Sequence, residues 1–568
     1  MAGAAQRALA GGGPLLRIGV MTDTHIGETK ASCQRVKSAC ELFRREGVDM
    51  VVNVGDIADY HYPKGYAAYR ETMENAFGGM SAEERPKELF VYAAHDTFAY
   101  NGCKNRSEWK KYVKEAFADM QRLLGAPNGP YAAGTVKGFP YLTFPQRMVE
   151  DLDWRRIERM ISDAEAANPG KPVFVFAHVP PAGTTRTGSG LARKTELFSR
   201  HPHVVNISGH VHGSLADEQA IWQGAFTSVS AGCLQNWGDG RSGVVGNNVK
   251  RMNNYGAMVI EVFPSRIVFR RFDVRDGKEY HAEDPWTIPW PFDPATAPYR
   301  HDMRRERSKA PTFADGASLS VSPGDAGSGG LVLTVPAASG EPRPFLYRVH
   351  LDRKGADGRW IAHARRDIFG DFWMREHERP KYNAVDFAAP YFDAGQEYRF
   401  RAAPVNCWGK EGSPIMVECP APERPAKQPT VVWQTADAMK DCTFLPGLSG
   451  GRALVQSDGF YGMGKRDARL EFPKSVWDGP KGARFRFSID MHTVQGGQPT
   501  WTIVLRNPNP LKNAVNRIST PEGDSAGMLR YVFDFTKGAA RHYYYLLVRE
   551  GGEGRIRFGR VLIERLDP

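Results

Sequence analysis

Short apolar runs alternate with longer segments of helical periodicity over about residues 15–300. Runs such as LLRIGVMTD (15–23) and KPVFVFAHV (171–179) are rich in aliphatic residues, as expected for strands buried on both faces of a sheet. Segment 30–47 places apolar residues on one helical face and stops at a glycine, and segment 152–170 is a second predicted helix that ends at Pro169-Gly170. The alternation predicts an α/β layer fold that closes with a hairpin over 255–274.

The pattern changes after about residue 300. A basic, proline-containing stretch (286–312) is predicted to be a linker, and PAPERPAKQP (420–429) is a second one by composition. Residues 310–420 and 430–568 show short alternating strands and no convincing helix, which predicts two all-β sandwich domains. The expected organisation is a tail over 1–14, an α/β domain over 15–300 and two β-sandwiches.

Composition and charge restrict the classes of partner. The chain has 75 Lys+Arg and 64 Asp+Glu, a formal net charge of +11 and a pI near 9.2, which favours anionic partners in general. It has no long Lys/Arg run, zinc-finger spacing or RNA-recognition signature, so no nucleic-acid motif supports a more specific partner. No apolar run reaches the roughly 18 residues needed to span a membrane. The seven cysteines have no CxxC spacing and indicate neither a zinc site nor a disulfide framework.

Metal-binding side chains follow five of the predicted strands. Asp and His are found at strand ends in the segments DTH (23–25), GDIAD (55–59), AAHD (93–96), AH (177–178) and GHVH (209–212). Ligands gather at the carboxyl ends of strands in α/β sheets. Mixed carboxylate and imidazole ligands suit Zn, Fe or Mn. The ordered set therefore predicts a metal site at one edge of the fold.

This ordered set resembles the calcineurin-like metallophosphoesterase superfamily over about residues 15–280. The resemblance implies an α+β sandwich with two central sheets flanked by helices. It also implies metal-dependent hydrolysis of phosphate monoesters or diesters, with a metal-bound hydroxide as nucleophile. Two divalent ions would be the cofactors, and a phosphate ester of unknown identity the substrate.

Three stretches between the predicted strands, 59–70, 98–111 and 180–196, are expected to be loops around the metal site. Their basic and aromatic residues, Arg186 among them, suit an organic phosphate, and ordinary solvated loops are the alternative.

The resemblance also implies a role for each matched residue. Asp23, His25 and His212 would hold one metal, His178 and His210 the second, and Asp56 would bridge both. His95 would contact the phosphate and protonate the leaving oxygen. Asp59 is the predicted orienting partner of His95, and a loop-capping carboxylate is the alternative for Asp59.

The chain departs from the family pattern where an Asn ligand precedes the catalytic histidine. Ala93-Ala94 stand in place of Gly-Asn, and alanine cannot ligate a metal. Three alternatives are open: an enzyme with a weaker second metal site, a replacement oxygen from another loop such as Asn236, or a degenerate site on a binding protein. We expect an active metallophosphoesterase.

The carboxy-terminal half resembles two kinds of β-module. Segment 394–414 resembles the end of a fibronectin type III domain, and residues 430–568 resemble a jelly-roll of the kind used to bind carbohydrate. The alternative function is therefore a catalytically weak protein that attaches to glycans or surfaces through these modules. Accessory β-modules, together with Ala8-Leu9-Ala10 as a signal-peptide remnant, predict an extracytoplasmic (periplasmic or secreted) protein.

Overall fold

A computed structural model shows how the chain is arranged. It describes residues 12–27, 30–58, 63–97, 106–125, 129–146, 152–186, 190–235, 255–324, 329–423, 429–446, 454–455, 461–462, 468–496, 502–506, 516–519, 527–537, 544–549 and 553–566. The described residues up to Arg307 form one compact unit, and those from Ser308 onward form another. Among the described helices, none has the length and apolar character needed to cross a membrane.

The first unit contains two mixed sheets. The first sheet runs in the order β12-β11-β10-β1-β2-β3, with β13 also paired to β11, and its β1, β2 and β3 are parallel. Its strands are β1 (Leu16–Met21), β2 (Met50–Asn53), β3 (Lys87–Phe90), β10 (Gly256–Phe263), β11 (Arg266–Asp273), β12 (Lys278–Tyr280) and β13 (Trp286–Pro289).

The second sheet runs in the order β4-β5-β6-β7-β9-β8 and is parallel from β5 through β9. Its strands are β4 (Ala132–Val136), β5 (Phe139–Thr143), β6 (Val173–Phe176), β7 (Val204–Ser208), β8 (Ile221–Gln223) and β9 (Thr227–Ser230).

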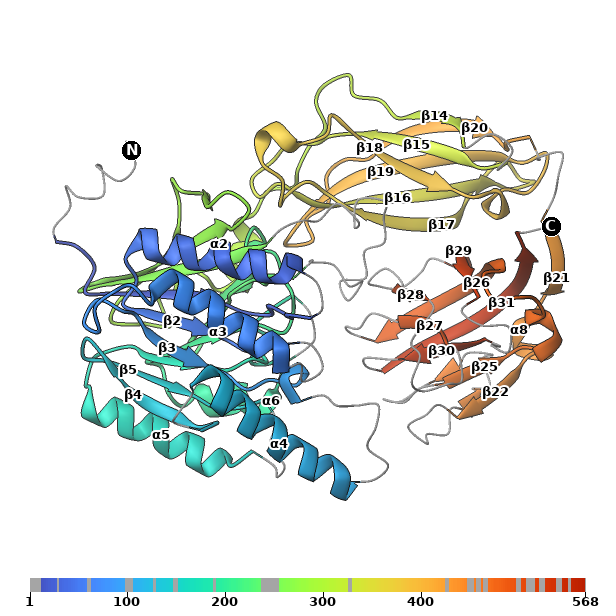
Figure 1. Cartoon of the computed structure of the whole chain (residues 1–568). Helices are drawn as coiled ribbons and strands as arrows, with labels where there is room; N and C mark the ends of the chain where they lie inside the picture. Colours follow the sequence, from blue (N-terminus) through green and yellow to red (C-terminus); the bar gives the residue numbers. More distant parts are fainter. Residues whose placement is uncertain are drawn as a thin grey trace. The chain divides into compact units, whose positions relative to one another are not determined.

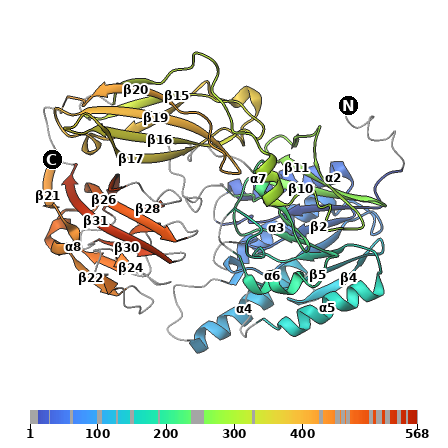
Figure 2. The same cartoon turned by 180° about the vertical axis from the view of Figure 1, so that it is seen from behind.

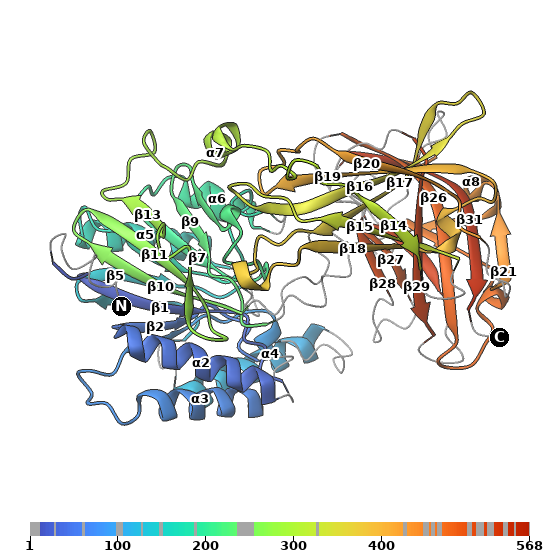
Figure 3. The same ribbon diagram turned by 90° about the horizontal axis from the view of Figure 1, so that it is seen from above.

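Helices cover the outer faces of both sheets. Figure 1 shows α2, α3 and α4 beside the first sheet, Figure 2 shows α5 and α6 beside the second, and Figure 3 shows α2 and α3 lying side by side. The helices of this unit are α2 (Lys30–Glu46), α3 (Pro63–Phe77), α4 (Arg106–Leu124), α5 (Trp154–Ala167), α6 (Ala192–Phe198) and α7 (His301–Arg307), with the 3-10 turns η1 (His95–Thr97) and η2 (Glu218–Ala220).

Three apolar cores explain this layering. Alternate residues of β2 and β6, such as Val52 and Phe174, face a core shared by the two sheets. Their neighbours Val51 and Val175 face the helices on either outer side. The strands are buried on both faces, which is why their sequences are continuous aliphatic runs rather than alternating ones. The predicted α+β sandwich with two central sheets is confirmed.

Three predicted loops and one predicted linker contain regular structure. The stretches 59–70, 98–111 and 180–196 were expected to be loops around the site, but they include the first turns of α3 and α4 and part of α6. The predicted linker 286–312 contains β13 and α7, and Trp286 on β13 is buried in the core between the sheets. The expectation was wrong here because burial of Trp286 and pairing with β11 outweigh the proline-rich composition.

The second unit begins with a β-sandwich. A three-stranded sheet, β14-β15-β18, and a four-stranded sheet, β17-β16-β19-β20, share one apolar core. The strands are β14 (Ser320–Pro323), β15 (Leu331–Pro336), β16 (Pro344–Lys354), β17 (Trp360–Phe369), β18 (Tyr382–Phe387), β19 (Glu397–Asn406) and β20 (Ile415–Pro420), with the turns η4 (Glu376–Glu378) and η5 (Ala389–Tyr391). The likeness to fibronectin type III stays a prediction.

A second sandwich follows. Its sheets run in the orders β23-β24-β31-β26-β29, with β21 paired to β31, and β22-β25-β30-β27-β28. The elements are β21 (Thr430–Thr435), α8 (Ala438–Asp441), β22 (Thr443–Pro446), β23 (Leu454–Val455), β24 (Tyr461–Gly462), β25 (Ala468–Glu471), η6 (Lys474–Trp477), β26 (Arg484–Gly496), β27 (Thr502–Arg506), β28 (Asn516–Ser519), β29 (Leu529–Thr536), β30 (Tyr545–Arg549) and β31 (Glu553–Arg565). The two predicted all-β sandwiches are confirmed as architecture, while the boundaries proposed for them stay predictions.

Candidate metal centre

The candidate ligands gather where strands of both sheets end. Asp23 and His25 follow β1, Asp56 follows β2, His95 follows β3, His178 follows β6, and His210 and His212 follow β7. The first three of these strands belong to one sheet and the last two to the other. The site is therefore built at the junction of the two sheets.

The backbone of the candidate ligands is unusual. Asp23, His25, Asp56, His210 and His212 all have positive φ angles, between 40° and 70°, in the left-handed region that non-glycine residues rarely adopt. Such a conformation costs about 1–3 kcal/mol per residue, and it is concentrated at functional sites where the surrounding structure enforces it. These turns direct the side chains of successive loops toward one place.

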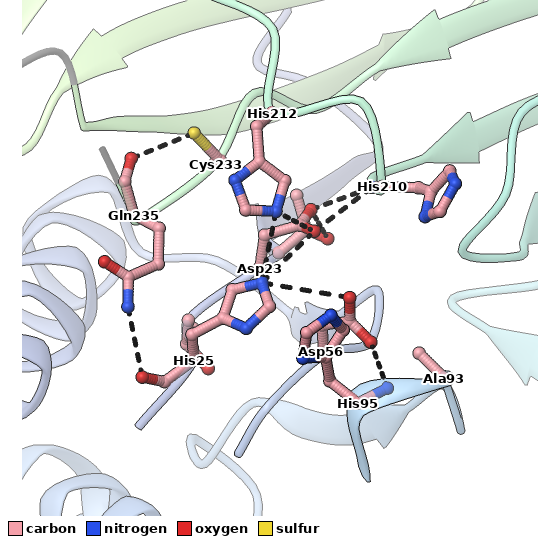
Figure 4. Close-up of polar contacts among 12 residues, drawn as sticks. Asp23, His25, Asp56, Ala93, His95, His210, His212, Cys233 and Gln235 are labelled. Atoms are coloured by element: carbon pink, nitrogen blue, oxygen red, sulfur yellow. Dashed lines mark hydrogen bonds and ion pairs between the residues drawn. The ribbon is translucent and has the colours of Figure 1, made fainter. Parts of the chain in front are cut away.

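The first group consists of Asp23, His25 and His212, whose ligand atoms all lie within 4.8 Å of one another. His212 Nε2 is 3.1 Å from both Asp23 Oδ1 and His25 Nε2, and His25 Nε2 is 3.8 Å from Asp23 Oδ1. Figure 4 shows the three side chains turned toward one another. Two imidazole nitrogens and a carboxylate oxygen at this spacing form a suitable set for a divalent ion.

The second group consists of Asp56, His178 and His210, again with ligand atoms within 4.8 Å. His178 Nδ1 donates to the Val54 carbonyl at 2.8 Å, because a carbonyl oxygen can only accept, so Nε2 faces the site. His178 Nε2 lies 3.0 Å from Asp56 Oδ2 and 3.8 Å from Asp23 Oδ1. His178 thus connects the two groups.

Asp56 also lies close to the first group, since its Oδ2 is 3.8 Å from His25 Nε2. A third set, His25, Asp56 and His95, meets the same 4.8 Å spacing. The side chain of Asp56 therefore stands between the two groups, as a bridging carboxylate would.

The charges of the site require a cation or protons. Burial raises the pKa of Asp23, but the neighbouring His212 and His178 outweigh burial and hold that pKa well below its usual range. Burial lowers the pKa of His178, but the Asp56 and Asp23 carboxylates raise it to about 9. The buried His178 Nε2 meets the Asp56 carboxylate at 3.0 Å and Asp23 Oδ1 at 3.8 Å as ion-pair contacts, without a well-directed hydrogen bond. A nitrogen so placed beside two carboxylates fits a metal ligand, with the ion replacing the proton.

A side-chain hydroxyl and a backbone N–H hold the Asp23 carboxylate in place. It accepts hydrogen bonds from Thr22 Oγ1 at 2.8 Å and from the His210 backbone N–H at 2.9 Å. The preceding residue has to be a glycine, because a Cβ on Gly209 would lie 2.4 Å from Asp23 Oδ2. The loop after β7 therefore packs directly on the Asp23 carboxylate, which explains the glycine in GHVH.

Asp96 is a member of the site that the sequence analysis does not assign. Its buried carboxylate accepts from the backbone N–H groups of Ile57 (2.9 Å), Ala58 (3.0 Å) and Ala93 (3.2 Å). Burial and the nearby Asp56 charge raise the pKa of Asp96 to about 7. Asp96 thereby joins the loop after β2 to the loop that carries His95. The acidic residue that follows His95 in the segment AAHD was the available signal.

His95 lies at the same junction. Its backbone N–H donates to Asp56 Oδ1 at 3.0 Å, and its ring meets the ring of His25 edge to face, with centroids 4.6 Å apart. The imidazole is therefore beside both groups, where a proton donor to a leaving group would be required.

The environment of Ala93 and Ala94 is closely packed. The Ala93 Cβ lies 2.7 Å from where a Cβ on Gly55 would stand, so the alanine fits because residue 55 is glycine. The Ala94 N–H donates to Gln146 Oε1 at 2.8 Å. Gln146 follows β5 and escaped the sequence analysis, since nothing in its local sequence indicates a contact with the AAHD segment.

The remaining predicted residues divide into two kinds. Asp59 and Asn236 lie outside the described residues, so the orienting role of Asp59 stays a prediction. Arg186, expected as a basic loop residue facing substrate, forms a two-pronged ion pair with Asp217 at 2.7 and 2.8 Å. Its charge is already satisfied within the fold.

Comparison with known proteins agrees with this geometry. Residues 16–214 match the family model described as calcineurin-like phosphoesterase. The matched segment contains the first and second groups and His95, so in this segment the chain is similar to calcineurin-like phosphoesterases. A search among curated proteins found no match.

Solved structures similar to parts of the chain were also found. A dimetal phosphatase from Danio rerio is 11% identical, covers 49% of this chain and 99% of its own, and has a TM-score of 0.33. Purple acid phosphatase from yellow lupin (Lupinus luteus) is 12% identical over 48% of this chain and 53% of its own, with a TM-score of 0.33. A carbohydrate-binding module from a Cellvibrio mixtus lichenase is 9% identical over 24% of this chain and 100% of its own, with a TM-score of 0.16.

Proposed function

We propose that this protein hydrolyses phosphate esters at a centre of two divalent ions, held by the first and second groups. The observation that carries the proposal is the position of Asp56, whose carboxylate is 3.0 Å from His178 and 3.8 Å from His25 and so reaches both groups. Mn, Fe and Zn all suit the donor set. Bound ions would polarise the phosphate ester and lower the pKa of the attacking water.

The chain's own residues divide the remaining work. Asp23, His25 and His212 would hold one ion, His178 and His210 the other, and Asp56 both. His95 would donate the proton that the leaving oxygen needs. Asp96 would hold the loop that carries His95 against the loop that carries Asp56. The preference between monoesters and diesters is left to experiment.

The test is metal content and hydrolysis measured on the same preparation. The protein is purified without chelator, equilibrated with Mn²⁺ or Zn²⁺, and analysed by mass spectrometry for ions per chain. Hydrolysis of p-nitrophenyl phosphate and bis-p-nitrophenyl phosphate is then followed. We expect two ions per chain and turnover of at least one substrate. Fewer than two ions per chain after equilibration, or hydrolysis of neither ester, would overturn the proposal.

The rival function, a catalytically weak protein that binds glycans through its β-sandwiches, rests on Ala94. A flat sugar-binding surface that includes Tyr544 is not favoured, because the Tyr544 side chain is buried against Trp477 and Phe535. Binding of soluble glycans by the full chain, without hydrolysis of either ester, would support the rival. An extracytoplasmic location remains part of the proposal.

A further inference from the structure

Lys194 is a buried cation next to the metal centre that the proposed chemistry does not use. It lies on α6, is 1% exposed, and donates from Nζ to the backbone carbonyls of Ala177 (3.4 Å) and Val179. These two carbonyls flank His178. A buried ammonium is costly unless its N–H groups are satisfied, so these contacts account for its position.

Lys194 contacts the chain just beyond the paired part of β5 and β6. The register between β5 and β6 ends at Thr143 and Phe176, whereas His178 lies beyond that point. The Lys194 ammonium stands 4.9 Å from the ring centroid of Phe144, the residue that follows β5. Lys194 therefore contacts residues that follow both strands, the Phe144 ring after β5 and the carbonyls of Ala177 and Val179 after β6.

Strand β7 also holds the segment around His178. The Gly209 N–H donates to the His178 carbonyl at 2.9 Å, and the Ala177 N–H donates to the Ile207 carbonyl at 3.1 Å. The peptide groups around His178 are thus held both by β7 and by Lys194. With Nδ1 bound to the Val54 carbonyl, the ring has one orientation, in which Nε2 faces Asp56.

We propose that Lys194 is a positioning residue for the second metal-binding group, through the two carbonyls that flank His178. This inference rests on the proposed function, because it assigns to Lys194 the role of holding His178, a proposed ligand of the second group. The second group has the greater need of such support, since Ala94 deprives it of the family's Asn ligand. Burial lowers the pKa of Lys194 to about 7. The neutral amine keeps two N–H donors, so both contacts are available in either form.

The test compares Mn²⁺ binding by full-length variants. Lys194→Met removes the amine at similar size. Two matched controls remove the same kind of contact elsewhere. Thr195→Val, on the same helix as Lys194, removes a hydroxyl that donates to the Ala182 carbonyl at 2.9 Å. Lys171→Met removes an amine whose Nζ donates to the Gly138 carbonyl at 2.7 Å. Calorimetry gives the two Mn²⁺ affinities, and electron paramagnetic resonance reports the spin coupling of a Mn²⁺ pair.

We expect Lys194→Met to keep one Mn²⁺ site, to weaken the other by about 10–100-fold and to lose the coupled-pair signal, as for other residues that orient a ligand. The controls should match the unmodified protein. Equal binding by Lys194→Met, or equal weakening of both sites, would overturn the inference. If Lys194→Met does not fold, the same measurement on Lys194→Gln decides. Failure of the unmodified protein to bind two ions would instead overturn the proposed function.

Discussion

His178 Nε2 lies 3.0 Å from Asp56 Oδ2, and this contact joins the end of β6 to the end of β2, strands of two different sheets. The proposed bridging carboxylate is thus held between the sheets rather than within one of them. A change at either residue should therefore affect ion binding before it affects the cores, because neither side chain belongs to the apolar clusters.

Replacement of His178 by alanine is expected to reduce the ion count from two to one per chain. The variant removes a ligand of the second group and leaves Asp23, His25 and His212 intact. Mass spectrometry of the Mn²⁺-equilibrated protein provides the count. His203→Ala is the matched control, since His203 stands at the start of β7 beside Trp290. Two ions in His178→Ala would contradict the assignment.

Replacement of His95 by alanine is expected to lower turnover at least about a hundredfold, the scale of general acid catalysis, with the ion count unchanged. Turnover and ion count are measured on one preparation. If the variant loses an ion as well, His95 is a ligand within the set that it forms with His25 and Asp56. Unchanged turnover would remove its role as proton donor.

Ala94→Asn tests whether the second group is impaired. An added amide oxygen is expected to strengthen binding of the weaker ion about 10-fold or more if the position is a true gap. Titration with Mn²⁺, followed by calorimetry, measures the change. An unchanged affinity would mean that another oxygen already serves the second group. Gln146→Ala, added to Ala94→Asn, shows whether the Gln146 side chain, which accepts from the Ala94 N–H, contributes to binding of this ion.

Asp96→Asn is expected to destabilise the first unit by about 1–3 kcal/mol. The carboxylate accepts three backbone N–H bonds, whereas an amide presents one acceptor oxygen and buries an N–H₂ among donors. Urea unfolding measures the difference. Asp302→Asn, which removes an exposed pair with Arg300, should change stability little. A similar effect of both substitutions would contradict the prediction.

Acid is expected to destabilise the second unit through His363. This buried imidazole donates from Nε2 to the Tyr391 carbonyl at 2.7 Å, and burial, aided by the Arg530 charge, lowers its pKa to about 4. The unfolded chain therefore binds more protons between about pH 6.5 and 4, so stability is lost as the pH falls through this window. The loss amounts to about 3 kcal/mol at most.

Urea unfolding between pH 7 and pH 4 measures this dependence. His363→Gln keeps an N–H donor and removes the titrating group, so its stability should fall less steeply with acid. His377→Gln, at an exposed position of η4, is the control and should retain the full dependence. Identical slopes for all three proteins would contradict the role of His363.

The helices and strands could be predicted from sequence to different extents. The strands of the first unit were predictable because burial on both faces demands aliphatic runs, and α2 was predictable from one apolar face ended by Gly47. The α3 and α4 helices were not, because the polar and glycine-containing segments that lead into them resemble loops. β13 was missed since its place depends on pairing with β11, which no local pattern in the segment indicates.

The sequence by itself determined the kinds of side chain that the strands deliver: carboxylates and imidazoles directly after β1, β2, β3, β6 and β7. It also determined the departure at Ala94, which is a matter of chemistry alone. Only the tertiary structure decided that His178 meets Asp56, that Asp96 ties two loops together, and that Lys194 donates to the carbonyls on either side of His178. These relationships join residues far apart in the chain. Their geometry depends on how two sheets pack and where each strand stops, and local periodicity records neither.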